Sequence, residues 1–358
     1  MRRILILALL CIGANVYAQH EFKFVEGSDL CLTGKLMMDT SNPYNRVDTL
    51  KYKGFTKSEN NQVRMSAGLA VAFRTNSTAI SVMTQYGKYW RSTNMNAYAG
   101  KGYDLYILSD GKWVHAASGV QPDSAQDENL VLISEMDDSY KTCLLYLPLF
   151  SEVYSVKIGV DTGSDISSIE NPFRHRVGVF GSSFTHGSCA TRSGMSWPSQ
   201  FSRNTGIQLL NLGCAGNCKM QPYFADVLAD AQVDAFLFDT FSNPNAEIMK
   251  ERLFPFIEMI QKAHPGKPLI FQKTIYRQNR TFSREKDIYE SRKSVVADSL
   301  MKIAQKKYKD VYYITPDASS ESFCTSVDGV HPDNYGYALW AGSIERQVLR
   351  ILRKYSIR

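Results

Sequence analysis

The sequence predicts two domains: an all-β sandwich or jelly roll at residues 19–168, followed by a three-layer α/β domain with a mainly parallel sheet at residues 169–358. Three observations support this fold class. The chain has 358 residues, which is more than one typical domain holds. Its first part contains short, alternating apolar runs between turns, and its second part alternates apolar runs with long amphipathic stretches.

The first 18 residues have the pattern of a signal peptide. Arg2 and Arg3 precede an apolar run from Ile4 to Ala14, and Val16-Tyr-Ala18 provides small residues for cleavage. The apolar run is too short to cross a bilayer. We therefore expect a secreted or periplasmic protein without integral membrane association.

Residues 19–168 are expected to form antiparallel strands. Turn sequences such as Ser109-Asp-Gly111 and Asp161-Thr-Gly163 separate runs in which apolar residues alternate with polar ones. The clearest of these runs are Gly68–Phe73, Ala79–Met83, Tyr103–Leu108 and Val153–Val160. Many short strands without a long helix are typical of a β-sandwich or a jelly roll.

Residues 169–358 show the alternation of strands and helices that builds a parallel sheet. The expected strands are 176–182, 207–212, 234–240, 268–274 and 311–315. The expected helices are 195–204, 220–231, 246–264, 284–308 and 333–355. In such sheets functional residues gather in the loops after the carboxyl ends of the strands.

Two short segments near these strand ends carry the chemistry. The first, Gly181-Ser-Ser183-Phe, follows an apolar run, so the hydroxyl of Ser183 should emerge where a strand turns into a loop. The second, Asp328-Gly-Val-His331-Pro, places a carboxylate three residues before a histidine. Asp328 can accept the Nδ1–H of His331 and leave Nε2 free as a base. Together they predict a hydrolase with a serine nucleophile.

Residues 172–358 resemble the SGNH hydrolases, also called GDSL-like esterases, whose α/β domain is flavodoxin-like. Four sequence blocks carry the resemblance: Gly181–Phe184, Asn211–Asn217, Asp239–Asn243 and Asp328–Pro332. The resemblance maps the nucleophile to Ser183, the base to His331 and the acid to Asp328. Four blocks in order, each at a predicted strand end, are much more specific than any single one.

The same resemblance implies an oxyanion hole. Its donors would be the backbone N–H groups of Ser183 and Gly216 and the side-chain amide of Asn243. The chain departs from the family pattern at two places: Ser182 stands where many members have Asp, and the usual Gly-x-Asn-Asp is absent around Asn243. Asn243, which precedes Pro244, could instead cap the helix that follows.

The first domain has a counterpart as well. Gly102-Tyr-Asp-Leu-Tyr106 resembles the signature of the GxDLY domain, a β-rich domain that precedes such esterases, and the segment from Leu147 to Asp161 fits its end. No low-complexity linker separates the halves. We therefore expect the two domains to pack together and the first to contribute to the active site.

Three further residues are candidates for substrate binding. His186 follows the nucleophile by three residues and is expected in the pocket wall or just behind it. Tyr276 and Arg277 begin a stretch rich in tyrosine and arginine that follows a sheet strand, and they could bind a sugar or an acidic substrate. The stretch could equally be a solvated entry to the next helix.

Composition limits the partners and cofactors. Without residues 1–18 the chain has 39 basic and 35 acidic side chains, a formal charge of +4 that forms no Lys/Arg block and gives no case for nucleic acid. Six cysteines remain, which could form a local disulfide or stay as buried thiols. Their spacing does not match a zinc site, so we expect no metal and no organic cofactor. The oligomeric state cannot be read from the sequence.

The leading functional hypothesis is a secreted serine esterase that removes a short acyl group, acetyl above all, from a carbohydrate. The acetyl-glycan part follows from the family resemblance and the export signal. A lipase or thioesterase of the same fold is the alternative within the enzyme class. A glycan-binding protein with a silent catalytic domain is the alternative from another class. A peptidase is disfavoured, because amides demand more substrate-binding structure than the sequence shows.

Overall fold

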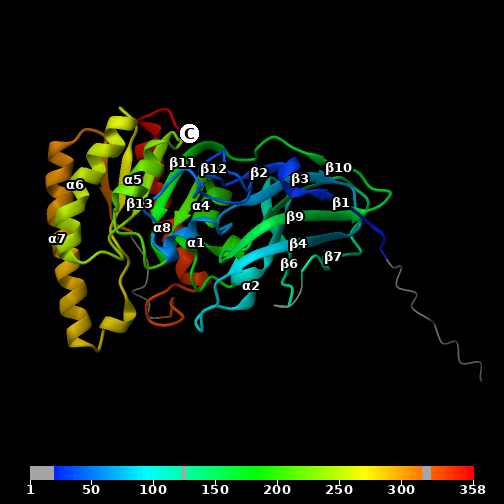
Figure 1. The fold of residues 1–358 in the computed structure, drawn as a ribbon, viewed down its shortest axis with the longest axis horizontal. Coiled ribbons are helices and arrows are strands. Elements are labelled where there is room, and N and C mark those ends of the chain that lie inside the picture. The colour runs from blue at the N-terminus through cyan, green and yellow to red at the C-terminus, as the bar shows by residue number, and fades with distance from the viewer. Residues whose placement is uncertain (1–19, 123–125, 317–323) are drawn as a thin grey trace, which may run out of the picture.

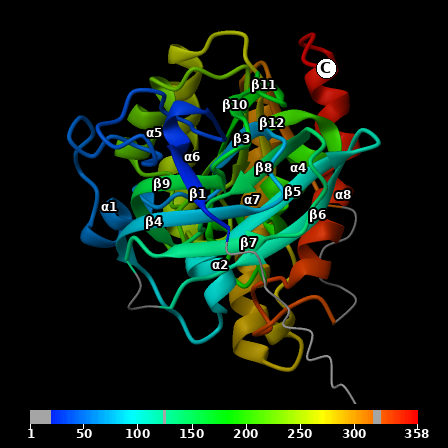
Figure 2. The same cartoon turned by 90° about the vertical axis from the view of Figure 1, so that its right-hand side faces the viewer.

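The computed structural model describes residues 20–122, 126–316 and 324–358, so the expected signal peptide lies outside the described residues. The β-rich half and the α/β half lie side by side along the longest axis of the molecule (Figure 1). Figure 2 views the molecule from the β-rich end, with the α/β half behind it.

The N-terminal half consists of two antiparallel sheets. The first has the strand order β1 (Phe22–Glu26), β9 (Ser151–Asp161), β4 (Ile80–Tyr89) and β7 (Asn129–Ile133). The second has the order β10 (Ile166–Ser168), β3 (Ala70–Thr75), β8 (Lys141–Tyr146), β5 (Tyr103–Ser109) and β6 (Lys112–Gly119), with β2 (Cys31–Thr33) also paired to β3. Three short helices lie between these strands: η1 (Gly27–Asp29), α1 (Lys57–Val63) and α2 (Ala97–Lys101).

Both sheets face one apolar core. Val71 and Phe73 from one sheet pack in the same buried cluster as Val156 and Ile158 from the other. The members of each pair are two residues apart, because side chains alternate between the faces of a strand. An antiparallel β-rich N-terminal domain is thereby confirmed, whereas its jelly-roll connectivity stays a prediction.

The C-terminal half contains a five-stranded parallel sheet. Its order is β12 (Ile207–Gly213), β11 (Arg174–Gly181), β13 (Ala235–Asp239), β14 (Leu269–Gln272) and β15 (Val311–Ile314). The first strand in sequence, β11, therefore lies between β12 and β13. The chain reverses direction across the sheet at this point, and such a switch point opens a crevice at the carboxyl ends of the strands.

Helices cover both faces of this sheet. The helices are α3 (Ser183–His186), α4 (Trp197–Thr205), α5 (Pro222–Ala229), α6 (Ala246–Ala263), α7 (Arg284–Lys307) and α8 (Asn334–Arg353), with short turns at η2 (Ser193–Met195) and η3 (Gln278–Arg280). Val177 and Val179 face the side covered by α4 and α8, and Phe180 faces the side of α5, α6 and α7. The predicted three-layer α/β domain is thus confirmed, with the predicted strands and helices shifted by only a few residues at their ends.

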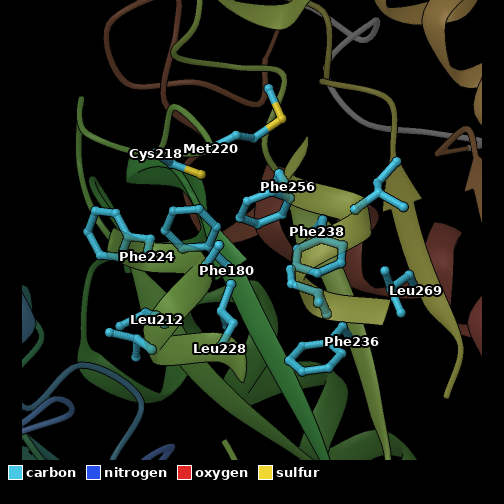
Figure 3. Close-up of a cluster of buried hydrophobic side chains, with 14 of the residues drawn as sticks. Phe180, Leu212, Cys218, Met220, Phe224, Leu228, Phe236, Phe238, Phe256 and Leu269 are labelled. Atoms are coloured by element: carbon cyan, nitrogen blue, oxygen red, sulfur yellow. The ribbon is translucent and has the colours of Figure 1, made fainter. Parts of the chain in front are cut away.

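Aromatic rings fill the layer between the sheet and α5 and α6. Phe180, Phe236 and Phe238 from the sheet meet Phe224 and Phe256 from the helices (Figure 3). All five side chains are at most 2 % exposed. Burial of a side chain of this size stabilises the fold by roughly 1.5–3 kcal/mol, so this layer provides a rigid support for the strand ends.

The two halves share their cores. Leu36 and Val47, from the N-terminal half, lie in the same apolar cluster as Phe224, and Phe150 lies in the cluster that contains Phe184. The guanidinium of Arg46 is completely buried between the halves.

Arg46 donates hydrogen bonds across this boundary to the carbonyl oxygens of Asn211 (3.1 Å) and Gly213 (3.0 Å), at the end of β12. It also bonds to the carbonyls of Gln62 and Met65 on its own side. The end of β12 is therefore held in place by the N-terminal half.

Candidate active site

Ser183 lies at the carboxyl end of the central strand β11. Ser182 caps the short helix α3, because its hydroxyl accepts the backbone N–H of Phe184, and Ser183 is the first residue of that helix. The strand ends at Gly181, where an added Cβ would lie 2.0 Å from the Thr185 hydroxyl, so only glycine fits there. This tight turn exposes 8 % of Ser183 at the surface.

His331 and Asp328 complete a hydrogen-bonded line with Ser183. The Nε2 atom of His331 is 2.9 Å from the Ser183 hydroxyl, and its Nδ1 atom is 2.8 Å from Oδ2 of Asp328. The other carboxylate oxygen of Asp328 accepts the backbone N–H groups of Val330 (2.9 Å) and His331 (2.7 Å). The structure therefore brings together the three residues that the sequence nominated as nucleophile, base and acid.

The Asp328 carboxyl remains ionised in this setting. Burial raises its pKa, but hydrogen bonds from the backbone and ring of His331 and from the amide of Asn94 outweigh burial and lower the pKa to about 2. An ionised acceptor holds the Nδ1–H tautomer of His331, and Nε2 is then available to take the proton of Ser183.

A second carboxylate lies beneath the nucleophile. Asp239, the last residue of β13, is completely buried, and its Oδ2 accepts the backbone N–H (3.1 Å) and hydroxyl (2.7 Å) of Ser182 and the hydroxyl of Thr185 (3.0 Å). Where the resemblance expects Asp at position 182, this chain has Ser182 bonded to the Asp239 carboxylate. The pKa of Asp239 is raised to about 6, mainly by burial. Asp239 fixes the turn on which Ser183 sits.

The two other oxyanion candidates lie on the loops after β12 and β13. Gly216 is exposed and has φ of +73°, a left-handed conformation that glycine adopts without strain. The Oδ1 atom of Asn243 accepts the backbone N–H of Cys218 at 3.1 Å, which fixes the amide and turns its Nδ2 donors away from that loop. The cap of α6 is Asn245, whose side chain accepts the N–H of Ile248, so Asn243 is not needed for that purpose.

The structure places His186 away from the pocket wall. Its side chain is completely buried, stacks on Phe150 at a centroid distance of 4.0 Å, and bonds through Nε2 to the carbonyl of Leu149 at 2.8 Å. The helix α3 turns the ring toward the N-terminal half rather than toward Ser183. Its position corrects the expectation of a substrate contact, since no atom of this histidine is accessible to a ligand.

Arg277 and Tyr276 lie on the loop after β14. Arg277 forms an ion pair with Glu290 at 2.8 Å and donates to the backbone and hydroxyl oxygens of Ser242, next to Asn243. The hydroxyl of Tyr276 is 3.2 Å from that of Thr281. Arg277 thus supports the loop that carries the oxyanion candidate and is held by internal partners.

Two hollows flank the loops of the candidate site. One, of about 410 Å³, is lined by residues of the N-terminal half, among them Lys57, Ser58, Asn61, Lys88, Tyr89 and Trp90. Its Ser58 hydroxyl accepts the side-chain amide of Asn217, next to Gly216 (3.2 Å). The other, of about 480 Å³, includes Arg277, Asn279 and Tyr289, and the Asn279 N–H donates to the carbonyl of Gly329 in the loop of the acid.

Three residues that shape this site are not predicted as site residues from the sequence. Arg46 and Asn94 come from the N-terminal half and contact the end of β12 and Asp328, respectively. No local pattern marks them, because each acts on a residue more than 160 positions away. Asp239 begins the block Asp239–Asn243, but the sequence assigned it no role. Its position at the end of β13, the strand that pairs with β11, could have indicated that it lies near the nucleophile.

The described residues contain six cysteines and one group of side chains that could hold a metal ion. No disulfide joins any two cysteines among the described residues, so the local disulfide considered from the sequence is not formed. One group of three potential ligand atoms, from Cys189, Asp328 and His331, lies within 4.8 Å. Asp328 and His331 are hydrogen-bonded to one another, and the thiol of Cys189 donates to the carbonyl of Asn94 at 3.1 Å.

Among the described helices, none has the length and hydropathy needed to span a membrane.

Comparisons with known proteins agree with this geometry. Residues 174–350 match the GDSL-like lipase/acylhydrolase family, and residues 22–166 match the GxDLY family, the N-terminus of SGNH-hydrolase-type esterases. No curated protein sequence matches the chain.

Solved structures extend the likeness over both domains. A protein from Bacteroides ovatus ATCC 8483, described as a GDSL-like lipase, has 33 % identity and a TM-score of 0.89, and the match covers 93 % of this chain and 98 % of that one. The salicylyl-acyltransferase SsfX3 of a tetracycline biosynthetic pathway has 19 % identity, a TM-score of 0.70 and coverages of 94 % and 99 %.

A family two carbohydrate esterase from Cellvibrio japonicus has 11 % identity, a TM-score of 0.60 and coverages of 94 % and 99 %. At identities of 19 % and 11 %, the acyltransferase and the carbohydrate esterase show that the fold is shared. The match to the Bacteroides ovatus protein covers nearly the whole of both chains, and its identity of 33 % establishes the family. The chain therefore belongs to the GDSL-like, or SGNH, hydrolase family with a GxDLY-type N-terminal domain, and it is a carboxylic ester hydrolase.

Proposed function

We propose that this chain is an exported serine esterase that removes short acyl groups, acetyl above all, from carbohydrates. The observation that carries the proposal is the line of hydrogen bonds from Ser183 through His331 to Asp328, at 2.9 Å and 2.8 Å. A serine hydroxyl becomes a nucleophile only when a base within such a distance takes its proton. The family supplies the reaction class, and the export is inferred from residues 1–18.

The acylation step follows from these positions. The Ser183 oxygen attacks the ester carbonyl while His331 Nε2 takes its proton, and Asp328 stabilises the imidazolium. The negative charge on the carbonyl oxygen would be bound by the N–H groups of Ser183 and Gly216 and the amide of Asn243. Collapse of the intermediate breaks the ester bond, and His331 returns the proton to the leaving alcohol.

Deacylation repeats the sequence with water. His331 takes a proton from the water that attacks the acyl-enzyme, and the second tetrahedral intermediate releases the carboxylic acid while Ser183 regains its proton. Every proton is handled by His331, so this route needs no metal ion and no organic cofactor.

A carbohydrate as the leaving alcohol is supported by the hollow beside the oxyanion loop. Trp90 is 39 % exposed there, next to Tyr89, and Lys57, Lys88 and Asn61 supply hydrogen-bond donors. Exposed aromatic faces with polar groups at their edges suit the apolar faces and hydroxyls of sugar rings. A carbohydrate esterase with the same fold, from Cellvibrio japonicus, is consistent with this proposal.

The test is hydrolysis of p-nitrophenyl acetate, butyrate and octanoate by the purified protein without residues 1–18. We expect rapid acetate turnover that falls with chain length and is lost in Ser183→Ala. Ser167→Ala, on the exposed face of β10, is the matched control and should retain activity. A preference for octanoate would favour the lipase alternative. The absence of any Ser183-dependent turnover would refute the proposal and favour a glycan-binding protein.

Acetate release from acetylated oligosaccharides then tests the substrate class. Trp90→Ala should lower kcat/KM on the oligosaccharide more than on p-nitrophenyl acetate, because only the oligosaccharide has sugar rings that an indole face could bind. An equal effect on both substrates would argue against a sugar site at Trp90.

A further inference from the structure

A loop of the N-terminal domain reaches the acid of the candidate triad. The loop runs from the end of β4 to the start of α2, over residues 90–96. From it, the Nδ2 atom of Asn94 donates a hydrogen bond of 2.8 Å to Oδ2 of Asp328, which is 234 positions away in the sequence. The same Oδ2 atom lies 2.8 Å from Nδ1 of His331. One carboxylate oxygen therefore joins the N-terminal domain to the histidine.

Both polar groups of the Asn94 side chain form hydrogen bonds, and so does its backbone carbonyl. Its Oδ1 accepts the hydroxyl of Ser92 at 2.6 Å, and its backbone oxygen accepts the thiol of Cys189 at 3.1 Å. Two residues later Asn96 caps α2 by accepting the N–H of Ala99 at 2.8 Å. A side chain fixed in this way has lost its rotamer freedom before it meets Asp328, so the contact differs from a chance meeting of two surface residues.

The Asp328 carboxylate needs such a partner. Its side chain is 30 % exposed, so water can compete for Oδ2. Oδ1 is oriented by the backbone N–H groups of Val330 and His331, but these bonds still allow the carboxylate plane to tilt. The donor from Asn94 fixes the second oxygen, and with it the direction of the bond to His331.

We infer that Asn94 is a positioning residue of the esterase site: it holds the Asp328 carboxylate in the plane that orients His331 toward Ser183. The inference rests on the proposed function, because the positioned groups act only in that reaction. Asn94 does not touch the reacting atoms. Its effect should therefore fall on kcat rather than on KM, since substrate binding does not use the Asp328–His331 bond.

Two substitutions separate positioning from packing. Asn94→Ala removes the amide, and Asn94→Asp keeps its shape but replaces the donor with a carboxylate that repels Asp328. We expect kcat for p-nitrophenyl acetate to fall about tenfold in Asn94→Ala and about 100-fold in Asn94→Asp, with KM within about twofold of the parent value. Thr93→Ala, at the exposed neighbouring position, is the control and should keep the parent kcat.

The order of the two variants is decisive. If Asn94 serves only to pack the loop, the isosteric Asn94→Asp should retain more activity than Asn94→Ala, and that order would overturn the inference. An unchanged kcat in both variants would overturn it as well, while Ser183-dependent turnover of the parent would leave the esterase proposal standing. A parent protein without Ser183-dependent turnover would overturn both.

A spectroscopic measurement checks the same point without turnover. The proton shared by His331 and Asp328 should give a downfield ¹H NMR resonance in the parent protein that broadens or is lost in Asn94→Ala. Melting temperatures and circular dichroism of each variant establish that it is folded. A resonance unchanged in the folded Asn94→Ala protein would contradict a positioning role.

Discussion

Replacement of Asp239 by asparagine should stabilise the protein at alkaline pH and have little effect at pH 4. The carboxyl group is completely buried, and only its Oδ2 atom is bonded, to Ser182 and Thr185. In the part of the chain that the structure describes, no donor reaches Oδ1. An asparagine can keep Oδ2 as the acceptor of all three hydrogen bonds and place its NH₂ group where Oδ1 now lies.

The magnitude follows from the pKa of the carboxyl. Burial raises the pKa of Asp239 from 3.8 to about 6, against the opposing effect of the hydrogen bonds from Ser182 and Thr185. Because the folded-state pKa lies above the unfolded one, the neutral carboxyl contributes stability that is complete below about pH 4 and is lost as the pH rises through 6. A rise in pKa of this size means that ionisation of the buried carboxyl lowers the free energy of unfolding by about 3 kcal/mol at pH 8. Asp239→Asn should recover most of that free energy.

Urea unfolding at pH 4 and pH 8, followed by tryptophan fluorescence, measures the effect. We expect the free energy of unfolding of the variant to exceed that of the parent by about 3 kcal/mol at pH 8 and by less than about 1 kcal/mol at pH 4. Asp110→Asn, at an exposed turn, removes the same formal charge and should change the free energy of unfolding by at most about 0.5 kcal/mol at either pH. The reasoning would be refuted if the free energies of unfolding of variant and parent differed equally at both pH values, or if the variant were less stable than the parent at pH 8.

Two further predictions concern the groups around the oxyanion loop. Arg46→Met should lower the free energy of unfolding by about 3–5 kcal/mol, because it leaves buried carbonyl oxygens such as that of Gly213 without their donor. Thermal unfolding beside the exposed Arg74→Met should reveal this loss, and equal melting temperatures for the two variants would contradict it. Asn243→Ala should lower kcat for p-nitrophenyl acetate by about 100–1,000-fold and the free energy of unfolding by about 1–3 kcal/mol, because the N–H of Cys218 loses its acceptor. A loss below about tenfold would exclude its amide from the oxyanion hole.

Most of the α/β domain could be predicted from the sequence because its signals are local. Period-two alternation in β11 sends Val177 and Val179 to one face and Phe180 to the other, and the amphipathic helices follow at regular spacing. The Asp328–His331 pair could be predicted for the same reason, since three residues in one loop fix its geometry. The pairing of Ser183 with His331 needed only the rule that strand ends of a parallel sheet meet.

The remaining features depend on how the two domains pack. His186 shows the difference: its distance of three residues from Ser183 suggested a pocket residue, but α3 directs its ring into the boundary between the halves, against Phe150. Arg46 and Asn94 sit in segments without periodicity, and their partners lie in the other half of the chain. Such contacts are fixed by tertiary structure, so a single sequence carries no signal for them.

The buried guanidinium of Arg46 and the amide of Asn94 have a consequence for how this chain could be recombined with its relatives. One holds the end of the strand that leads to Gly216, and the other holds the candidate acid, so the N-terminal half supplies parts of both sides of the site. We therefore expect the α/β half to lose two contacts that shape its site when it is separated from the N-terminal half. A chimera that joins it to the β-rich half of a relative should inherit a working site only if that half carries equivalent donors at both places. Recombination at the domain boundary is constrained accordingly, even though the two halves match separate family models.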